Sequence, residues 1–301
     1  MVSGHMRISL RPIRYFLMLA LLLAARPGHA QEITLPAFMT KTEPLPGNGF
    51  ALQISAQRAL EMGFPSIASD MYQHLLDNPA TKAELRNQLV VDLVTALLDE
   101  DRTTEASAAL QKYIGLPTAA FRLRQALVAM RERRFDDARN IAAGITVEDL
   151  PASDRSWFYF LQGSLPDVAR DVNRSVALFQ QAVDAAVSVS QRTRFELEKE
   201  KAKLNQGEFS EPRLAILRQS VDRSQGSVMY EAVSSLAIML NGLNKKSEAV
   251  ALLQRELRPL PQEERLTSDK WRLMLGMISG ADDAIGRNAL GTLLATGSDR
   301  T

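Results

Sequence analysis

Residues 230–261, YEAVSSLAIMLNGLNKKSEAVALLQRELRPLP, carry the pattern that decides the fold. Their first half places apolar residues at intervals of three and four, which puts them on one face of a helix: Val233, Leu236, Ala237 and Leu240. After a turn at Asn244, a second apolar stripe follows at Ala249, Leu253 and Leu257. Pro261 ends the unit, because proline cannot continue a helix. The stretch therefore predicts two antiparallel helices joined by a short turn.

Similar pairs recur along the rest of the chain. Ala106 stands 38 residues after Ala68, and both begin the same apolar spacing. A third pair covers residues 119–145, and a fourth turns near Pro166. Self-similarity at intervals of 32 to 38 residues predicts stacked helical hairpins, each of which covers the apolar face of its neighbour. Small residues are expected where the helices approach closely: Ala56, Ala68, Ala106, Ala138, Ala237 and Ala249.

This pattern resembles the tetratricopeptide repeat. With Tyr230 as position 1, apolar residues fall at positions 4, 7, 8 and 11, alanine at 20, a large residue at 24 and proline at 32. The match is sharp in the first, third and sixth pairs and weak in the fifth, whose charged first helix at residues 191–204 is expected to be exposed. The resemblance implies an all-α fold, a right-handed superhelical solenoid of about six to seven antiparallel helix pairs over residues 50–301, with continuation beyond Thr301 left open.

Residues 1–30 have a different composition. Arg7, Arg11 and Arg14 precede an apolar run of eleven residues, YFLMLALLLAA at positions 15–25, and a small residue, Ala30, follows. These features are typical of a secretory signal peptide. The apolar run is too short to span a bilayer, which needs about 20 residues. We expect cleavage near Ala30 and a periplasmic or secreted product that begins with an extended linker at residues 31–49.

The composition excludes several kinds of site. The chain has no cysteine, which excludes disulfides, cysteine nucleophiles and thiolate metal sites. His74 is the single histidine after the predicted signal peptide, so we expect no histidine-rich metal site and no cofactor. Without the four arginines of residues 1–30, the formal charge changes from +1 to −3. No concentrated basic surface remains, and no nucleic-acid partner is expected.

No group of residues has the spacing of a catalytic site. The glycines after Gly276 do not follow a strand, as a phosphate-binding loop would require. The acidic residues Asp99 to Asp101 are interpreted as a solvated turn, and His74 as a partly exposed helix residue. Trp157 and Trp271 begin apolar stripes, which favours core packing over a ligand-stacking surface. The sequence therefore predicts a protein that is not an enzyme.

The resemblance also implies a binding surface, because tetratricopeptide arrays bind peptides in a groove lined by the first helix of each pair. The corresponding positions here are Gln53, Gln57, Arg124, Arg131, Arg155, Gln162, Glu231, Ser234 and Asn241. Arg124 and Arg131 are seven residues apart, on nearly the same helix face, and Arg155 belongs to the next pair. We expect such a basic strip to bind a carboxylate or an acidic segment. The alternative is that these are ordinary solvated arginines.

Three functions remain open from the sequence. The first is an exported, non-enzymatic scaffold that binds a protein or peptide in the bacterial cell envelope and reaches the membrane only through a partner. The second is the helical part of a larger periplasmic enzyme, similar to lytic transglycosylases, with its catalytic domain after Thr301. The third is sugar or lipid binding, which requires that Trp157 and Trp271 be exposed. The sequence specifies neither the partner nor the oligomeric state.

Overall fold

The computed structural model describes residues 48–261, 264–280 and 283–298. The predicted signal peptide and residues 31–47 of the predicted linker lie outside them. The described residues are mainly helical and contain no β-strand, so the all-α class is confirmed. The first of the described helices begins at Asn48, two residues before the expected start of the repeats. None of the described helices combines the length and the apolar character needed to cross a membrane.

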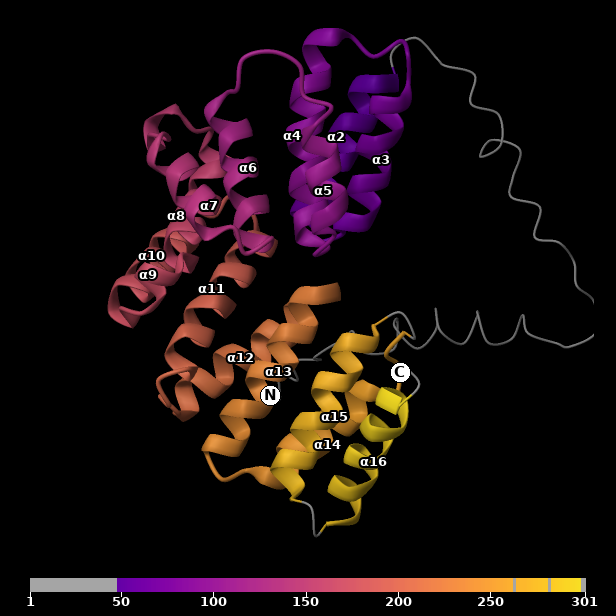
Figure 1. The fold of residues 1–301 in the computed structure, drawn as a ribbon, viewed down its shortest axis with the longest axis vertical. Helices are drawn as coiled ribbons and strands as arrows, with labels where there is room; N and C mark the ends of the chain where they lie inside the picture. Colours follow the sequence, from indigo (N-terminus) through magenta and orange to yellow (C-terminus); the bar gives the residue numbers. More distant parts are fainter. Residues whose placement is uncertain (1–47, 262–263, 281–282, 299–301) are drawn as a thin grey trace, which may run out of the picture. The chain divides into compact units, whose positions relative to one another are not determined.

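Fifteen α-helices occur in the described residues, most of them arranged as consecutive antiparallel neighbours (Figure 1). They are α2 (Asn48–Glu61), α3 (Pro65–Asp77), α4 (Ala83–Asp99), α5 (Thr103–Leu110), α6 (Ala119–Arg131), α7 (Phe135–Ala143), α8 (Ala152–Ser164), α9 (Pro166–Ala169), α10 (Val172–Asp184), α11 (Val189–Leu204), α12 (Glu211–Arg223), α13 (Gly226–Gly242), α14 (Lys246–Leu257), α15 (Arg265–Ser279) and α16 (Ala284–Ser298). Helices α8 and α10 pack together as the fourth pair, and α9 is a single turn inserted between them.

Five pairs turn through the same backbone geometry. A residue with positive φ separates their two helices: Gly63 (85°), Asp101 (60°), Arg133 (63°), Gly207 (76°) and Asn244 (60°). In each turn, the following N–H donates to the carbonyl five residues earlier, as Lys245 does to Leu240 at 2.8 Å. This bond satisfies a carbonyl that the end of the first helix would otherwise leave unpaired. The turn predicted at Asn244 is confirmed.

Several helices begin at residues suited to that position. Pro65 and Pro166 occupy the first turns of α3 and α9, where the missing N–H is not needed. The side chains of Thr118 and Asp171 accept hydrogen bonds from the N–H groups of Phe121 and Arg174, both at 3.2 Å, at the starts of α6 and α10. Local sequence therefore sets where these helices start, and packing sets which faces they bury.

Buried apolar side chains form two cores. The first core extends from α2 to α10 and includes Phe195 of α11, and the second core extends from Leu197 of α11 to Ala289 of α16. Close packing explains the alanines in both cores, because a larger side chain has no space there. All six alanines expected at close contacts have an exposed fraction of 0%: Ala56, Ala68, Ala106, Ala138, Ala237 and Ala249.

Helix α11 joins the two cores, and the prediction that it is an exposed helix is wrong. Phe195 packs in the first core and Leu197 in the second. The carboxylate of Glu200, of which 1% is exposed, accepts a hydrogen bond from Nε of Arg213 on α12 at 2.6 Å. A helix rich in charged residues is expected to face solvent, but Glu200 is buried because it forms an ion pair with Arg213 on the next helix. Glu198 and Lys201, three residues apart on α11, form an ion pair at 3.0 Å.

A second link to α11 comes from the end of α4, 95 residues earlier in the chain. Nη2 of Arg194 lies 3.1 Å from both the carboxylate Oδ1 and the backbone oxygen of Asp99. The hydroxyl of Ser227, on α13, donates to the same backbone oxygen at 3.2 Å. Burial raises the pKa of Asp99, although Arg194 and Arg131 oppose the shift. The interpretation of Asp99 as part of a solvated turn is therefore wrong, and we call this link the α4–α11 contact.

Candidate functional site

A groove of about 240 Å³ lies among the first helices of five pairs. We call it the inner groove. Polar and aromatic side chains from α2, α3, α4, α6, α8 and α11 line it: Gln53, Gln57, Glu61, Tyr72, Gln88, Asp92, Thr95, Asp99, Arg124, Asp154, Trp157 and Gln191. Of the nine residues predicted for a binding groove, Gln53, Gln57 and Arg124 are in this set. These three residues come from the first helices of the first and third pairs, α2 and α6.

Arg124 and Asp154 form a buried ion pair in the wall of the inner groove. Nη1 and Nη2 of Arg124 lie 2.6 and 2.8 Å from the two carboxylate oxygens of Asp154, and about 5% of each side chain is exposed (5% and 6%). Nε of Arg124 donates to the hydroxyl of Thr95 at 3.0 Å. The guanidinium is therefore buried and ion-paired within the chain, with hydrogen bonds from Nε and Nη2, and is neither a solvated arginine nor an open clamp for a carboxylate.

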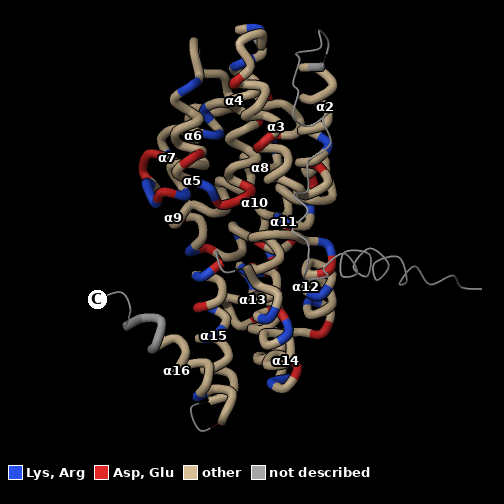
Figure 2. The backbone as a smooth tube through the Cα atoms, turned by 90° about the vertical axis from the view of Figure 1, so that its right-hand side faces the viewer, with Lys and Arg blue, Asp and Glu red and all other residues tan. Residues whose placement is uncertain are grey.

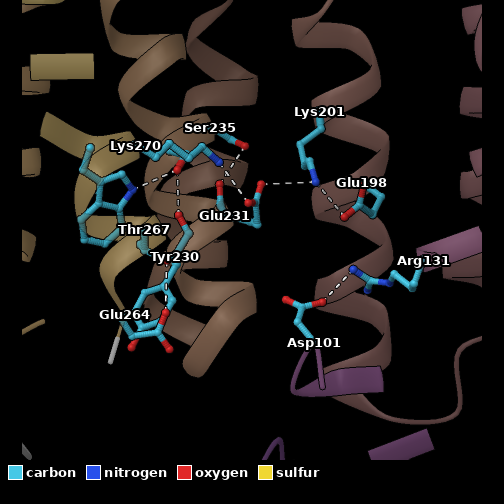
Figure 3. Close-up of polar contacts among 12 residues, drawn as sticks. Asp101, Arg131, Glu198, Lys201, Tyr230, Glu231, Ser235, Glu264, Thr267 and Lys270 are labelled. Carbon is cyan, nitrogen blue, oxygen red and sulfur yellow. Dashed lines mark hydrogen bonds and ion pairs between the residues drawn. The ribbon is translucent and has the colours of Figure 1, made fainter. Parts of the chain in front are cut away.

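The other two arginines of the predicted basic strip also have partners. Arg131 lies 2.7 Å from the carboxylate of Asp101, which neutralises its charge (Figure 3). Arg155 is exposed, and its Nε donates to the backbone oxygen of Leu150 at 3.4 Å. Neither Arg131 nor Arg155 lines the inner groove. The prediction of a shared basic strip is wrong. Acidic residues on neighbouring helix pairs form ion pairs with Arg124 and Arg131, and the sequence alone does not reveal these partners.

Acidic side chains outnumber basic ones in the lining of the inner groove. Asp92, on α4, is half-buried and accepts a hydrogen bond from Nε2 of Gln88 at 2.9 Å. Burial raises the pKa of Asp92 to about 6, and the nearby carboxylate of Asp154 adds to the rise, while Gln88 and Arg124 oppose it. Burial also raises the pKa of the Tyr72 phenol above its usual range, with further contributions from Asp92 and Glu61. The groove thus presents negative charge to a ligand.

The two tryptophans pack in the cores, as the apolar stripes predicted. Trp157 is 3% exposed and meets Phe160 and Phe195 edge-on, with ring centroids 5.7 and 5.2 Å apart. Trp271 is 0% exposed, and its Nε1 donates to the hydroxyl of Ser234 at 3.0 Å. Their burial removes the basis for sugar or lipid binding on exposed tryptophans. In contrast to Trp271, the buried Nε1–H of Trp157 has no hydrogen-bond partner among the described residues.

A second polar arrangement crosses the first helices of the last three pairs. Lys201 of α11 lies 3.0 Å from Glu198 and 3.4 Å from Glu231 of α13, which in turn lies 3.0 Å from Lys270 of α15 (Figure 3). We call this series the charge ladder. Burial alone would raise the pKa of Glu231, but Lys201 and Lys270 hold it below its usual range. Positive and negative groups alternate, so the charge ladder neutralises itself.

The remaining predicted groove residues do not line the inner groove. Ser234 is buried and donates to the backbone oxygen of Tyr230 at 3.0 Å, and Asn241 is half-buried on α13. Gln162 borders a separate hollow of about 400 Å³ beside Arg139. The hairpins that carry these residues contribute them to other parts of the structure than the inner groove.

No family model and no curated protein matches this chain. Its function therefore has to be inferred from the side chains of the inner groove.

The chemistry of the described residues suits binding. Among them, no group of three or more histidine or acidic side chains is placed to hold a metal ion. His74 is exposed on α3 and does not line the inner groove. Lys, Arg, Asp and Glu are interspersed along the described helices in Figure 2, without a long basic tract. The distinctive features are the half-buried carboxylate of Asp92 and the amides around it.

Proposed function

We propose that the chain is a non-enzymatic helical-repeat scaffold, built on a tetratricopeptide-like plan, that binds a segment of a partner protein in the inner groove. The observation that carries this proposal is the lining of the groove by the first helices of consecutive pairs. Such a surface offers side chains from several repeats to one extended ligand. Amides of Gln53 and Gln57 suit hydrogen bonding to a peptide backbone.

The repeat plan is supported by geometry that returns along the chain. Gly63, Asp101 and Arg133 have the same left-handed turn conformation at intervals of 38 and 32 residues. Fully buried alanines, such as Ala68 and Ala249, occur five residues after such a turn residue. A turn and a close contact repeated in register are expected of stacked hairpins.

Site-specific photo-crosslinking tests the binding function. A benzophenone amino acid replaces Gln57 in the inner groove and, as a matched control, the exposed Gln111 outside it. We expect partner adducts at position 57 and none at position 111 when the full chain is irradiated in its native cells. Equal adducts at both positions, or none at position 57, would contradict groove binding.

We further propose that the scaffold is exported to the bacterial cell envelope. The support is the basic start, short apolar run and small residue of residues 1–30. N-terminal sequencing of the protein recovered from the envelope fraction should give a chain that begins near Gln31. A product that retains residues 15–25 would overturn this proposal.

A further inference from the structure

We propose that the inner groove takes a basic, extended peptide segment, with a lysine or arginine side chain of the ligand paired to Asp92. This inference rests on the proposed binding function and specifies the chemistry of its ligand. It reverses the acidic ligand expected from the sequence, because the arginine on which that expectation depended is already paired with Asp154.

The charges of the inner groove do not cancel. Arg124 is matched by Asp154, and Asp99 by Arg194. Asp92 has only the neutral amide of Gln88 as a hydrogen-bond partner among the described residues. Glu61, also in the lining, accepts only from Gln57, at 3.0 Å. Two carboxylates are therefore left without a cation within ion-pair distance in the described part of the chain.

The position of Asp92 is unfavourable unless a cation is bound. A half-buried carboxylate loses hydration, and the nearby carboxylate of Asp154 further disfavours its ionised form. The one nearby cation, Arg124, is held by two oxygens of Asp154. A lysine or arginine side chain from a ligand would offset this loss directly. Carboxylates placed at such a cost are characteristic of functional sites.

Peptide-binding groups surround the two carboxylates. Gln57 and Gln88 each use Nε2 toward a neighbouring carboxylate, and their Oε1 atoms have no hydrogen bond among the described residues. The Nε1–H of Trp157, in the wall of the groove, likewise lacks an acceptor among them. A backbone N–H can donate to the glutamines, and a backbone carbonyl can accept from the indole. The unpartnered indole is an observation independent of the acidic groups.

The layout of the groove favours an extended segment, because its lining residues come from five consecutive helix pairs. The groove has a volume of about 240 Å³. A short extended stretch therefore fits, with its basic side chain directed to Asp92.

The charge ladder provides an internal comparison. Glu231 there has lysines on both sides, at 3.4 and 3.0 Å (Figure 3). Asp92 occupies the corresponding kind of position, on the first helix of a pair, without such neighbours. A basic ligand can therefore supply to Asp92 the cation that Glu231 already has within the chain.

The test uses four blocked heptapeptide libraries with lysine, arginine, glutamate or norleucine fixed at the central position. Binding to the full chain is measured by fluorescence anisotropy at pH 7.5 in 50 mM and 300 mM salt. We expect the lysine and arginine libraries to bind at least tenfold more tightly than the norleucine library, and the added salt to weaken them. Binding of these two libraries should fall as the pH drops below about 6, when Asp92 takes up a proton.

Two variants separate this inference from the proposed function. Asp92→Asn should remove the preference for lysine and arginine, whereas Asp222→Asn, which deletes the same charge at an exposed position of α12, should retain it. Equal binding of all libraries, or tighter binding of the glutamate library, would overturn the basic ligand but leave groove binding intact. If no library binds, the basic ligand is overturned, and crosslinking at position 57 decides separately whether the groove binds a partner. Circular dichroism confirms that each variant is folded.

Discussion

The first core and the second core are built from similar hairpins, but the polar surfaces beside them differ in how completely their charges are paired. Around the first core, Arg124 and Asp154 form a buried pair, and Asp92 is left with a neutral partner. Beside the second core, the charge ladder alternates Lys201, Glu231 and Lys270, with 31–45% of each side chain exposed. The charges of the charge ladder are therefore balanced within the chain, whereas those of the inner groove are not.

This difference indicates where binding should be sought. A self-neutralised ladder on a partly exposed surface contributes to packing between repeats and gains little from a ligand. An incompletely paired groove gains from a ligand of opposite charge. Helix α11 belongs to both surfaces, since Gln191 lines the inner groove and Lys201 lies in the charge ladder.

The largest effect is expected from breaking the α4–α11 contact. Arg194→Ala leaves Asp99 buried without its cation, which should lower the free energy of unfolding by about 3–5 kcal/mol at pH 7. The loss should shrink in acid, because the raised pKa of Asp99 lets the folded state take up a proton there. Urea unfolding at pH 7 and pH 4.5 measures both effects.

The exposed neighbour Arg192 provides the control for that experiment. Arg192→Ala should leave the unfolding curve nearly unchanged. If the two cores depend on this contact for their cooperativity, the Arg194→Ala curve should also separate into two transitions. Equal stability of the two variants would show that the contact does not join the cores.

An intermediate effect is expected within the second core. Ala249→Leu should overpack the contact of α14 and cost about 1–3 kcal/mol, since Ala249 is 0% exposed. Ala251, exposed on the same helix, serves as the control, and Ala251→Leu should have little effect. Thermal denaturation checks this prediction, and an unchanged melting temperature for Ala249→Leu would mean that the repeat register at α14 is misassigned.

A smaller effect, of opposite sign, is expected in the inner groove. Asp92→Asn should stabilise the free protein at pH 7.5, because the raised pKa of Asp92 makes its ionised form unfavourable in the folded state. A shift from 3.8 to about 6 corresponds to at most about 3 kcal/mol, and partial exposure of the carboxylate reduces this to about 1 kcal/mol. The gain should vanish near pH 4, where the folded state holds the proton. A loss of stability at pH 7.5 in urea unfolding would argue that Asp92 is a structural residue.

The smallest effect is expected in the charge ladder. Glu231→Gln should cost about 0.5 kcal/mol, because its partners are partly exposed and salt screens them. The lowered pKa of Glu231 implies that its contribution is present at neutral pH and lost as the pH falls below the usual glutamate range. Urea unfolding in low and high salt tests this, and a cost that persists unchanged in 1 M salt would mean that Glu231 acts through packing.

Features with a local signal could be predicted from the sequence. Spacing and residue size within a single hairpin are enough to predict the turns at Gly63 and Asn244 and the buried alanines at positions such as Ala249. Gln53 and Gln57, which the repeat spacing predicts for a binding groove, line the inner groove.

Features that depend on distant partners could not be predicted. Arg124 and Asp154 are 30 residues apart, and Arg194 and Asp99 are 95 residues apart, with no local pattern that pairs them. When these partners are not known, the sequence predicts that Arg124 binds a ligand and that α11 is exposed to solvent. Charges on inward helix faces have to be assigned in opposite pairs before any remaining charge can be attributed to a ligand.

The titration of Asp92 tests the central claim most directly. Carbon-detected NMR of the side-chain carboxyl, assigned by its absence in Asp92→Asn, gives the pKa in the ligand-free full chain and after addition of the lysine-containing library. An uncompensated groove carboxylate predicts a pKa of about 6 without ligand and a clear fall when the basic peptide binds. A ligand-free pKa near 4 that the peptide leaves unchanged would contradict it.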